Sequence, residues 1–138
     1  MRREIEAEGR RWIGVPWRHQ GRSEHGIDCA GLVVMVGRCL GLTDYDNTCY
    51  GRRPDSLKFV EHFLRGGAVQ KSVGDALPGD ILIFRQNIYP CHCGLLTERA
   101  GVPMLLHAYA PRRKVVEEFF DDTWASRQIA CFSYAGVE

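Results

Sequence analysis

The chain has 138 residues, of which 45% are hydrophobic, and its 18 basic and 17 acidic side chains leave a formal net charge of +1. This balance lacks the basic excess that favours nucleic acid or anionic membranes, so charge indicates neither partner. No segment reaches the roughly 18 consecutive apolar residues of a spanning helix, and the charged start "MRREIEAEGRRW" lacks the apolar core of a signal peptide. We therefore expect one domain over residues 1–138, made in the cytoplasm, with no membrane insertion and no nucleic-acid partner.

The chain contains six cysteines, which are Cys29, Cys39, Cys49, Cys91, Cys93 and Cys131. In a reducing compartment a domain of this size needs no disulfides, so most of these thiols are expected to be buried and inert. The "CHC" of residues 91–93 suggests zinc, but no CxxC pair occurs in the chain, and alternation along a strand would turn His92 away from its two neighbours. We expect no metal and no cofactor.

The first part of the chain predicts two helices. Residues 2–13 are expected to form a short amphipathic helix that Gly14 ends. Its apolar face comprises Ile5, Gly9, Trp12 and Ile13. A second helix should begin after Asp28, a favourable N-cap, and end at Gly41. This second segment is apolar nearly all round, so we expect it to be buried.

A third helix and a series of strands are predicted for the remainder. The helix runs from Pro54 or Asp55 to Arg65, and its apolar positions are Leu57, Val60, Phe63 and Leu64. Later segments are short apolar runs separated by turns, at residues 77–84, 91–98, 103–110, 114–120 and 128–134. This order indicates an α+β domain in which N-terminal helices pack on a C-terminal antiparallel sheet.

Cys29 is the candidate nucleophile. At the first turn of a helix, unpaired backbone N–H groups and the positive end of the helix dipole both favour a thiolate. A neighbouring imidazolium can lower the pKa of such a thiol from about 8.5 to below neutrality. Cys39 lies at the opposite end of the same helix, Cys49 in a loop and the other three cysteines in strands, so position distinguishes Cys29. A buried structural thiol is the alternative interpretation.

A histidine is needed to activate this thiol, and the chain offers His19, His25, His62, His92 and His107. His62 is expected on the exposed face of the third helix, and His19 and His25 lie in a polar loop that could line a cleft. If "ERAG" (98–101) is a four-residue hairpin loop, Thr97 pairs with Val102 and His92 lies directly opposite His107. Residues opposite one another share a sheet face, with Cβ atoms about 5 Å apart. We expect His92 to act as base and His107 to orient it; two ordinary strand histidines are the alternative.

Four motifs along the chain resemble those of the NlpC/P60 family of cysteine peptidases. "WIGVPWRHQGRSEHGIDCAGLV" is similar to the family's Gly-x-Pro-Tyr-x-x-Gly-Gly pattern followed by Asp-Cys-Ser-Gly-Leu. "LPGDILIF", "CHCGLL" and "LLHAYA" are similar to its Pro-Gly-Asp, Ser-His-Val-Gly-Ile and Ile-His-Ala strands. The resemblance implies a papain-like α+β fold, a Cys29–His92–His107 triad and cleavage of peptidoglycan stem peptides.

The small phage-tail version of the family is the most similar subgroup, because "WIGVPWRHQ" precedes the cysteine and "HAYAPR" includes the second histidine. That likeness implies a place in a phage or phage-like tail tip, with tail-tip hub proteins as partners and the host cell wall as the site of action. Trp17 stands where the family has tyrosine, and Ala30 where it has serine. We expect Trp17 and Asp28 to contact substrate, although Trp17 could instead pack on the sheet and Asp28 also caps the helix.

Two other functions fit the same residues. A Cys-His site transfers any acyl group, so an amidase or acyltransferase on this scaffold is one alternative. The other is a structural tail-tip plug with little turnover, in which the fold is kept for docking.

Overall fold

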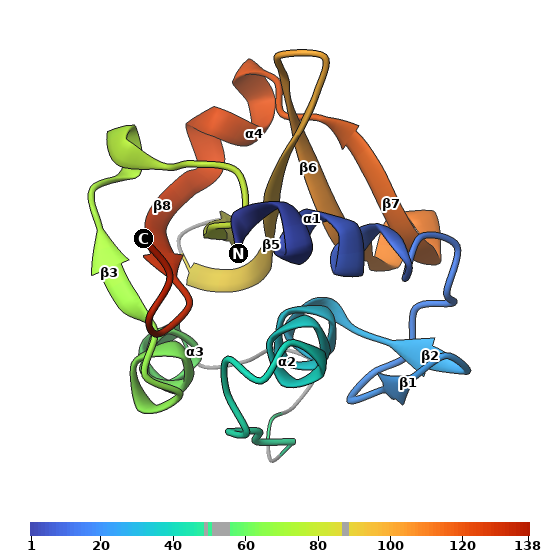
Figure 1. The fold of residues 1–138 in the computed structure, drawn as a ribbon. Coiled ribbons are helices and arrows are strands. Elements are labelled where there is room, and N and C mark those ends of the chain that lie inside the picture. Colours follow the sequence, from blue (N-terminus) through green and yellow to red (C-terminus); the bar gives the residue numbers. More distant parts are fainter. Residues whose placement is uncertain (49, 51–55, 87–88) are drawn as a thin grey trace.

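The structure, a computed structural model, describes residues 1–48, 50, 56–86 and 89–138. Its centre is a six-stranded antiparallel sheet in the order β3-β8-β4-β5-β6-β7 (Figure 1). The strands are β3 (Val69–Lys71), β4 (Ile81–Gln86), β5 (Tyr89–Arg99), β6 (Val102–Tyr109), β7 (Lys114–Phe119) and β8 (Gln128–Ser133). Every predicted strand is present, and β3 is an addition that the sequence pattern did not indicate.

Helices cover both faces of this sheet. On one face, α1 (Arg2–Arg10), α2 (Cys29–Cys39) and α3 (Ser56–Arg65) share a core with strand side chains such as Ile83, Leu95 and Leu106 (Figure 1). On the other face, α4 (Asp122–Arg127) buries Trp124 against Phe84 and Leu105. The predicted α+β class is confirmed, but α4 was not predicted, because its six residues are too few for a clear helical period.

The first helix is shorter than predicted. It ends at Arg10, and the chain then turns through Gly14, whose φ of 90° lies in the left-handed region. Ile13 is 43% exposed, so its assignment to the apolar face was wrong. Gly9 is buried, and a Cβ there would lie 2.6 Å from a methyl carbon of Leu106, so glycine lets α1 approach β6 closely.

The second helix begins where the sequence predicts. The Asp28 carboxylate accepts a hydrogen bond from the Gly31 N–H at 2.8 Å, which is the expected N-cap geometry. Leu32 and Val36 are buried, but Ala30 and Val34 are partly exposed and line a cavity. The expectation of burial all round was therefore wrong, and the extra apolar side chains face a cleft.

The third helix is described from Ser56 onward. The predicted start at Pro54 or Asp55 lies outside the described residues, as does Cys49. Phe63 packs on the core and stacks on Phe132 with ring centroids 5.8 Å apart. Leu64, in contrast, is 49% exposed and does not belong to the core face.

The β5–β6 hairpin has a different register from the predicted one. Arg99 pairs with Val102 across a two-residue turn of Ala100 and Gly101, whose φ angles are 51° and 82°. Two consecutive positive φ angles are typical of a type I′ turn, whose twist matches that of the strands. Thr97 consequently pairs with Met104, and the predicted partner Val102 was wrong. Because the shift is two residues, each side chain keeps its predicted face.

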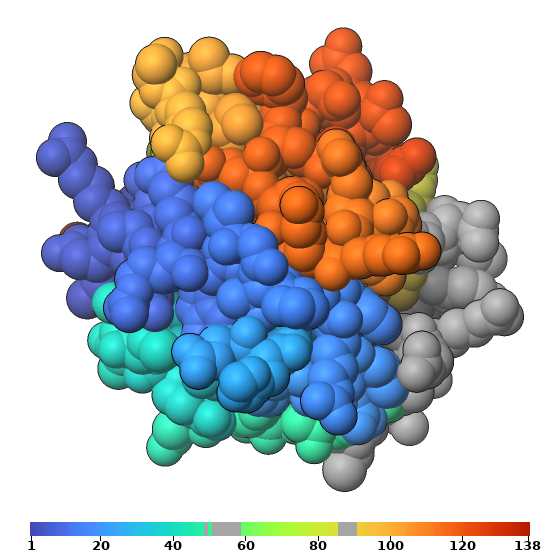
Figure 2. Space-filling model, turned by 90° about the vertical axis from the view of Figure 1, so that its right-hand side faces the viewer, coloured from blue at the N-terminus to red at the C-terminus, as the bar shows by residue number. Residues whose placement is uncertain are grey.

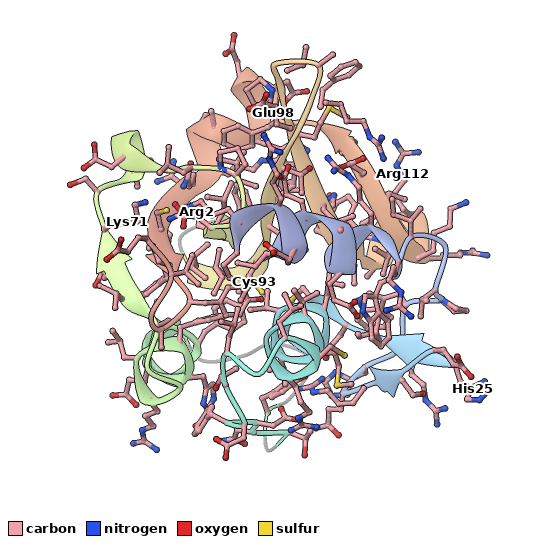
Figure 3. All side chains as sticks on the ribbon, viewed as in Figure 1. Arg2, His25, Lys71, Cys93, Glu98 and Arg112 are labelled. Atoms are coloured by element: carbon pink, nitrogen blue, oxygen red, sulfur yellow. The ribbon has the colours of Figure 1, made fainter. Side chains whose placement is uncertain are left out.

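Asp80 connects the N-terminus with three strands. Its carboxylate is fully buried and lies 2.8 Å from both the Arg2 guanidinium and the Lys71 ammonium, which approach each other in Figure 3. Ser133 of β8 and the Leu77 N–H also donate to it. The family-like "PGD" motif therefore ends in a charged clamp that holds the edge of the sheet.

The segment between α1 and α2 packs on the other sheet edge. Gly14 N–H donates to the Val115 carbonyl and Trp17 N–H to the Arg113 carbonyl, both at 2.9 Å. Figure 2 shows this N-terminal segment in blue against the orange residues around β7. It then forms the small ladder of β1 (Arg22–Ser23) and β2 (Gly26–Ile27), which leads directly into α2. This path places Trp17 beside the start of α2.

Candidate active site

Cys29 is the first residue of α2, where the sequence analysis placed it. Its side chain is partly exposed, and its backbone N–H lies in the first turn, where a helix has no internal acceptor. The carboxylate of Asp28 is turned back to cap the helix. The thiol therefore lies at the positive end of the α2 dipole and is partly buried.

The two strand histidines lie beside this thiol and contact each other. The imidazole of His92 interacts with the Cys29 thiol and lowers its pKa, and Nε2 of His92 lies 2.8 Å from Nδ1 of His107. The prediction that His92 and His107 are neighbours on one sheet face is confirmed, although the predicted pairing directly opposite one another was wrong. The side chains form a continuous series in the order Cys29, His92 and His107.

Cys93 also contacts the thiol. Together with His92, the Cys93 thiol holds the pKa of Cys29 well below its ordinary value, although the partial burial of Cys29 acts in the opposite direction. Burial and the same contact raise the pKa of Cys93 well above its ordinary value, so Cys93 remains protonated and donates. The sequence analysis treated Cys93 as strand packing, and nothing in the pattern indicated the contact.

His107 is fully buried and surrounded by rings. Tyr109 stacks on it with centroids 4.8 Å apart, and Trp124 meets it edge-on at 5.0 Å. Burial, followed by the charges of His92 and Arg112, lowers the pKa of His107 to about 2. His107 is therefore neutral at working pH, with one ring nitrogen protonated and the other free to accept a hydrogen bond.

A cavity of about 350 Å³ opens beside the thiol. Trp17, His19 and Tyr109 line it together with Cys29 and His92. Apolar side chains of α2 and α3 also line it, and these are Val33, Val34, Phe59 and Phe63. Trp17 and His19 therefore both line a cleft, and Trp17 also packs on the core.

Asp28 is the centre of a polar network. Besides the helix cap, its carboxylate accepts from Tyr50 O–H at 2.6 Å, Arg22 at 3.0 Å and Gln20 N–H at 2.8 Å. Burial, followed by the charge of Asp28, raises the pKa of Tyr50, so the phenol stays protonated. Arg22 also pairs with Asp46. Asp28 thus ties the loops on both sides of the cavity to the start of α2, and sequence reasoning missed Arg22 and Tyr50.

Two other histidines differ in their positions. His25 has a side chain that is 83% exposed and points away from the centre of the molecule, where Cys93 lies (Figure 3). His62 was expected at the surface, but it lines the cavity, and its Nδ1 lies 3.3 Å from the Tyr45 hydroxyl. The ring is therefore only partly exposed, because Tyr45 lies beside it.

A metal-binding cluster and a membrane-spanning helix are both absent from the described part of the chain. There, no group of three or more His, Cys, Asp or Glu side chains is placed to hold a metal ion. Within the same residues, no helix has the length and apolar character needed to cross a bilayer.

Comparison with known proteins identifies the family. The model of the NlpC/P60 family matches residues 14–132. The chain belongs to the NlpC/P60 family. A search of curated proteins found no match.

Solved structures share this NlpC/P60 fold. The NlpC/p60 domain of the peptidoglycan hydrolase SagA is 22% identical, with a TM-score of 0.68, and the match covers 96% of this chain and 98% of that one. An NlpC/P60 family protein from Bacillus cereus is 17% identical with a TM-score of 0.73, and the match covers 97% of this chain but 40% of that protein. An N-acetylmuramoyl-L-alanine amidase from Bacteroides uniformis is 11% identical with a TM-score of 0.63, and the match covers 95% and 96% of the two chains. At these identities the likeness establishes the fold.

Two departures from the usual NlpC/P60 pattern lie in the cavity wall. Trp17 and Ala30, which replace a tyrosine and a serine, both line the cavity. Trp17 offers an indole N–H and a larger apolar surface where the family has a phenol. This member of the NlpC/P60 family therefore has a more apolar wall next to its cysteine.

Proposed function

We propose that this protein is a cysteine hydrolase that cleaves an amide bond in peptidoglycan stem peptides, next to a D-glutamyl or diamino-acid residue. The observation that carries the proposal is the series of Cys29, His92 and His107 beside an open cavity. A thiol with a lowered pKa, hydrogen-bonded to an imidazole that a further residue orients, is the arrangement of an activated nucleophile. Membership of the NlpC/P60 family supports the substrate class.

The proposed mechanism assigns one role to each side chain. The Cys29 thiolate attacks the scissile carbonyl, and the Cys29 backbone N–H at the helix start stabilises the oxyanion. His92 carries the proton to the leaving amine, and then activates the water that hydrolyses the thioester. His107 holds the His92 ring in place through the 2.8 Å contact. Trp17 and Asp28 are proposed to line the substrate site, with Asp28 acting through the loops that it anchors.

The experiment that tests this function is a digestion of purified peptidoglycan. Wild type and Cys29→Ala are incubated with wall fragments, and the products are identified by mass spectrometry. We expect wild type to release peptides cut within the stem and Cys29→Ala to release none. Equal products from both proteins, or none from a wild type whose thiol is reactive, would contradict the proposal.

An acyltransferase or amidase that accepts an apolar acyl group is the second candidate. The observation that favours it is the apolar lining contributed by Val33, Val34, Phe59 and Phe63. The two candidates separate when wall fragments and short lipid esters are compared as substrates in one assay. Turnover of the esters with no release of stem peptides would favour the second candidate.

The biological setting is proposed on the sequence likeness to the phage-tail subgroup. We propose a tail-tip component that opens the cell wall, with hub proteins of the tail as partners. A structural plug with little turnover would need no activated thiol, so Cys29 in a plug would alkylate at pH 6 no faster than free cysteine. Rapid alkylation of Cys29 at pH 6 would therefore exclude the plug.

A further inference from the structure

Glu118 on β7 lies behind His107, on the side away from His92. In the β6–β7 ladder His107 pairs with Val116 and Leu105 pairs with Glu118, so Glu118 is the diagonal neighbour of His107 on the same face. Glu118 Oε2 lies 3.4 Å from His107 Nε2. The side chains therefore continue the series from Cys29 through His92 and His107 to a carboxylate.

His107 Nε2 and Glu118 Oε2, the two atoms that face each other, are buried and make no hydrogen bond within the part of the chain that the structure describes. Buried polar atoms that make no hydrogen bond are costly, at about 1–3 kcal/mol each. The 3.4 Å separation is within reach of a hydrogen bond, and a small rotation of the imidazole or the carboxylate would satisfy both atoms at once.

Neighbouring side chains hold the carboxylate in this position. Trp124 Nε1 donates to Glu118 Oε1 at 3.0 Å, which leaves Oε2 directed at the imidazole. Arg112 lies 3.9 Å from Oε2 and supplies a compensating positive charge. Glu118 is thus anchored by α4 on one side, and its second oxygen is available for His107.

The protonation of His107 follows from its two neighbours. His107 is neutral, so it carries a single ring proton, on Nδ1 or on Nε2. A proton on Nε2 would point at the carboxylate and would leave Nδ1 free to accept from Nε2–H of His92. That hydrogen bond in turn leaves Nδ1 of His92 to meet the Cys29 sulfur. The Nδ1–H tautomer would leave His107 Nε2 without a proton against the Glu118 carboxylate. It would also place two N–H groups between the histidines whenever His92 carries a proton on Nε2.

We propose that Glu118 is a positioning residue that selects the Nε2–H tautomer of His107 and so orients His92 toward Cys29. The consequence for catalysis rests on the proposed function, but the tautomer itself does not. The site is then a series of four side chains in which Glu118 acts through His107 and does not touch substrate. A carboxylate that merely anchored Trp124 would leave the tautomer unchanged when removed.

Glu118→Gln tests the role with a side chain of the same shape. The amide has a single acceptor oxygen, and when that oxygen keeps the hydrogen bond from Trp124, the NH2 group faces His107 and the Nε2–H tautomer loses its partner. The titratable and charged groups that face His107 are His92, Tyr109, Arg112 and Glu118, and all except Glu118 are unchanged in this variant. Glu117→Gln is the matched control, because Glu117 is the adjacent buried carboxylate and pairs with Arg10 and Arg99.

The primary readout is the ¹⁵N NMR of the histidine rings at pH 7. We expect His107 of wild type to carry its proton on Nε2, Glu118→Gln to shift it toward Nδ1, and Glu117→Gln to match wild type. The wild-type measurement needs no variant, and an Nδ1–H tautomer there would overturn the proposal. So would an unchanged tautomer in Glu118→Gln.

Two reaction rates extend the test. In Glu118→Gln we expect the rate of Cys29 alkylation by iodoacetamide at pH 6 and kcat/KM on stem peptides to fall about tenfold or more. The thermal midpoint should fall no further than in Glu117→Gln. Alkylation and the tautomer require no substrate, so their change in a protein that cleaves no peptidoglycan would refute the proposed function and keep the inference. Loss of stability in Glu118→Gln with normal alkylation would overturn the inference.

Discussion

The reactivity of Cys29 depends on two neighbouring side chains of different chemistry, a thiol and an imidazole. The Cys93 thiol and the His92 imidazole both lower the pKa of the Cys29 thiol, while burial opposes its ionisation. Cys93 is fully buried in β5, so holding its side chain beside Cys29 costs little further entropy. The residue that sequence analysis regarded as packing therefore contributes directly to the reactive thiol.

Replacing Cys93 with alanine should raise the pKa of Cys29. A hydrogen bond to a charged group is worth about 1.5–3 kcal/mol, so the alkylation rate at pH 6 should fall about tenfold. The pH dependence of iodoacetamide labelling, followed by peptide mapping, measures both the pKa and the modified residue. Cys131→Ala is the control, because Cys131 is another fully buried strand cysteine and its thiol contacts Asp80. We also expect Cys29 to be the fastest-labelled cysteine of wild type, and faster labelling of Cys91 or Cys49 would contradict the assignment.

His92→Ala should cost more activity than His107→Ala. A proton carrier contributes about 100-fold or more, whereas an orienting residue is partly replaceable. In the proposed tautomer His107 offers Nδ1 as an acceptor to His92, so the side-chain oxygen of asparagine or glutamine at 107 should restore part of the loss. Measured kcat/KM values on a stem peptide decide the order, and comparable losses for both alanine variants, or a larger loss for His107→Ala, would contradict the assigned roles.

Among the elements, the β5–β6 hairpin shows what the sequence pattern could and could not predict. The strands, their faces and the proximity of His92 and His107 followed from alternation, which a two-residue shift preserves. The register did not follow, because the turn places Ala100 at a positive φ, where asparagine or glycine would be the usual signal. α2 and its N-cap were predictable, since Asp28 and the apolar run define them locally.

The parts of the site that were missed depend on contacts between distant segments. Arg22, Tyr50 and Cys93 reach the start of α2 or its thiol from loops and a strand whose positions only the folded chain determines. His62 was assigned to the surface because the helical period alone cannot show that the Tyr45 hydroxyl contacts its ring. The local sequence pattern therefore identified the side chains that are proposed to react. It missed those that hold the start of α2 in place or change the pKa of its thiol.

The strained turn predicts a stabilising substitution. A non-glycine residue in the left-handed region costs about 1 kcal/mol, so Ala100→Gly or Ala100→Asn should raise the free energy of unfolding by up to about that amount. Ala125→Gly in the exposed part of α4 is the matched control and should lower it by about 0.5–1 kcal/mol. Urea unfolding measures all three, and destabilisation by both substitutions at 100 would show that the turn does not carry this strain.

For the whole molecule, the Asp80 carboxylate joins the N-terminal residue Arg2 to side chains of β3 and β8. Burial alone would raise the pKa of Asp80, but hydrogen bonds from Lys71, Arg2 and the Leu77 N–H outweigh it and hold that pKa below its ordinary value. A carboxylate with a lowered folded-state pKa stabilises the fold above the unfolded value of about 4. This contribution is lost as the pH falls through the folded-state pKa.

Asp80→Asn should therefore lower the free energy of unfolding at pH 7 by about 3 kcal/mol, because it leaves two cations around a neutral group. The variant should also lose less stability than wild type between pH 4 and pH 2, since the titrating group is gone. Asp75 is an exposed carboxylate that precedes Asp80 in the chain, and Asp75→Asn is the control. This substitution should change the free energy of unfolding by less than about 0.5 kcal/mol. Parallel pH profiles for wild type and Asp80→Asn would contradict this account of the clamp.

The central claim is that Cys29 forms a covalent acyl-enzyme, and acid-quenched mass spectrometry tests it most directly. Enzyme and a purified stem peptide are mixed, quenched at low pH within the first turnover, digested and mapped. We predict one acyl adduct, on the peptide that contains Cys29. Its mass should be that of the substrate fragment that carries the scissile carbonyl, and Cys29→Ala should show no adduct. An adduct on Cys93 or Cys91, or release of products by Cys29→Ala, would contradict it.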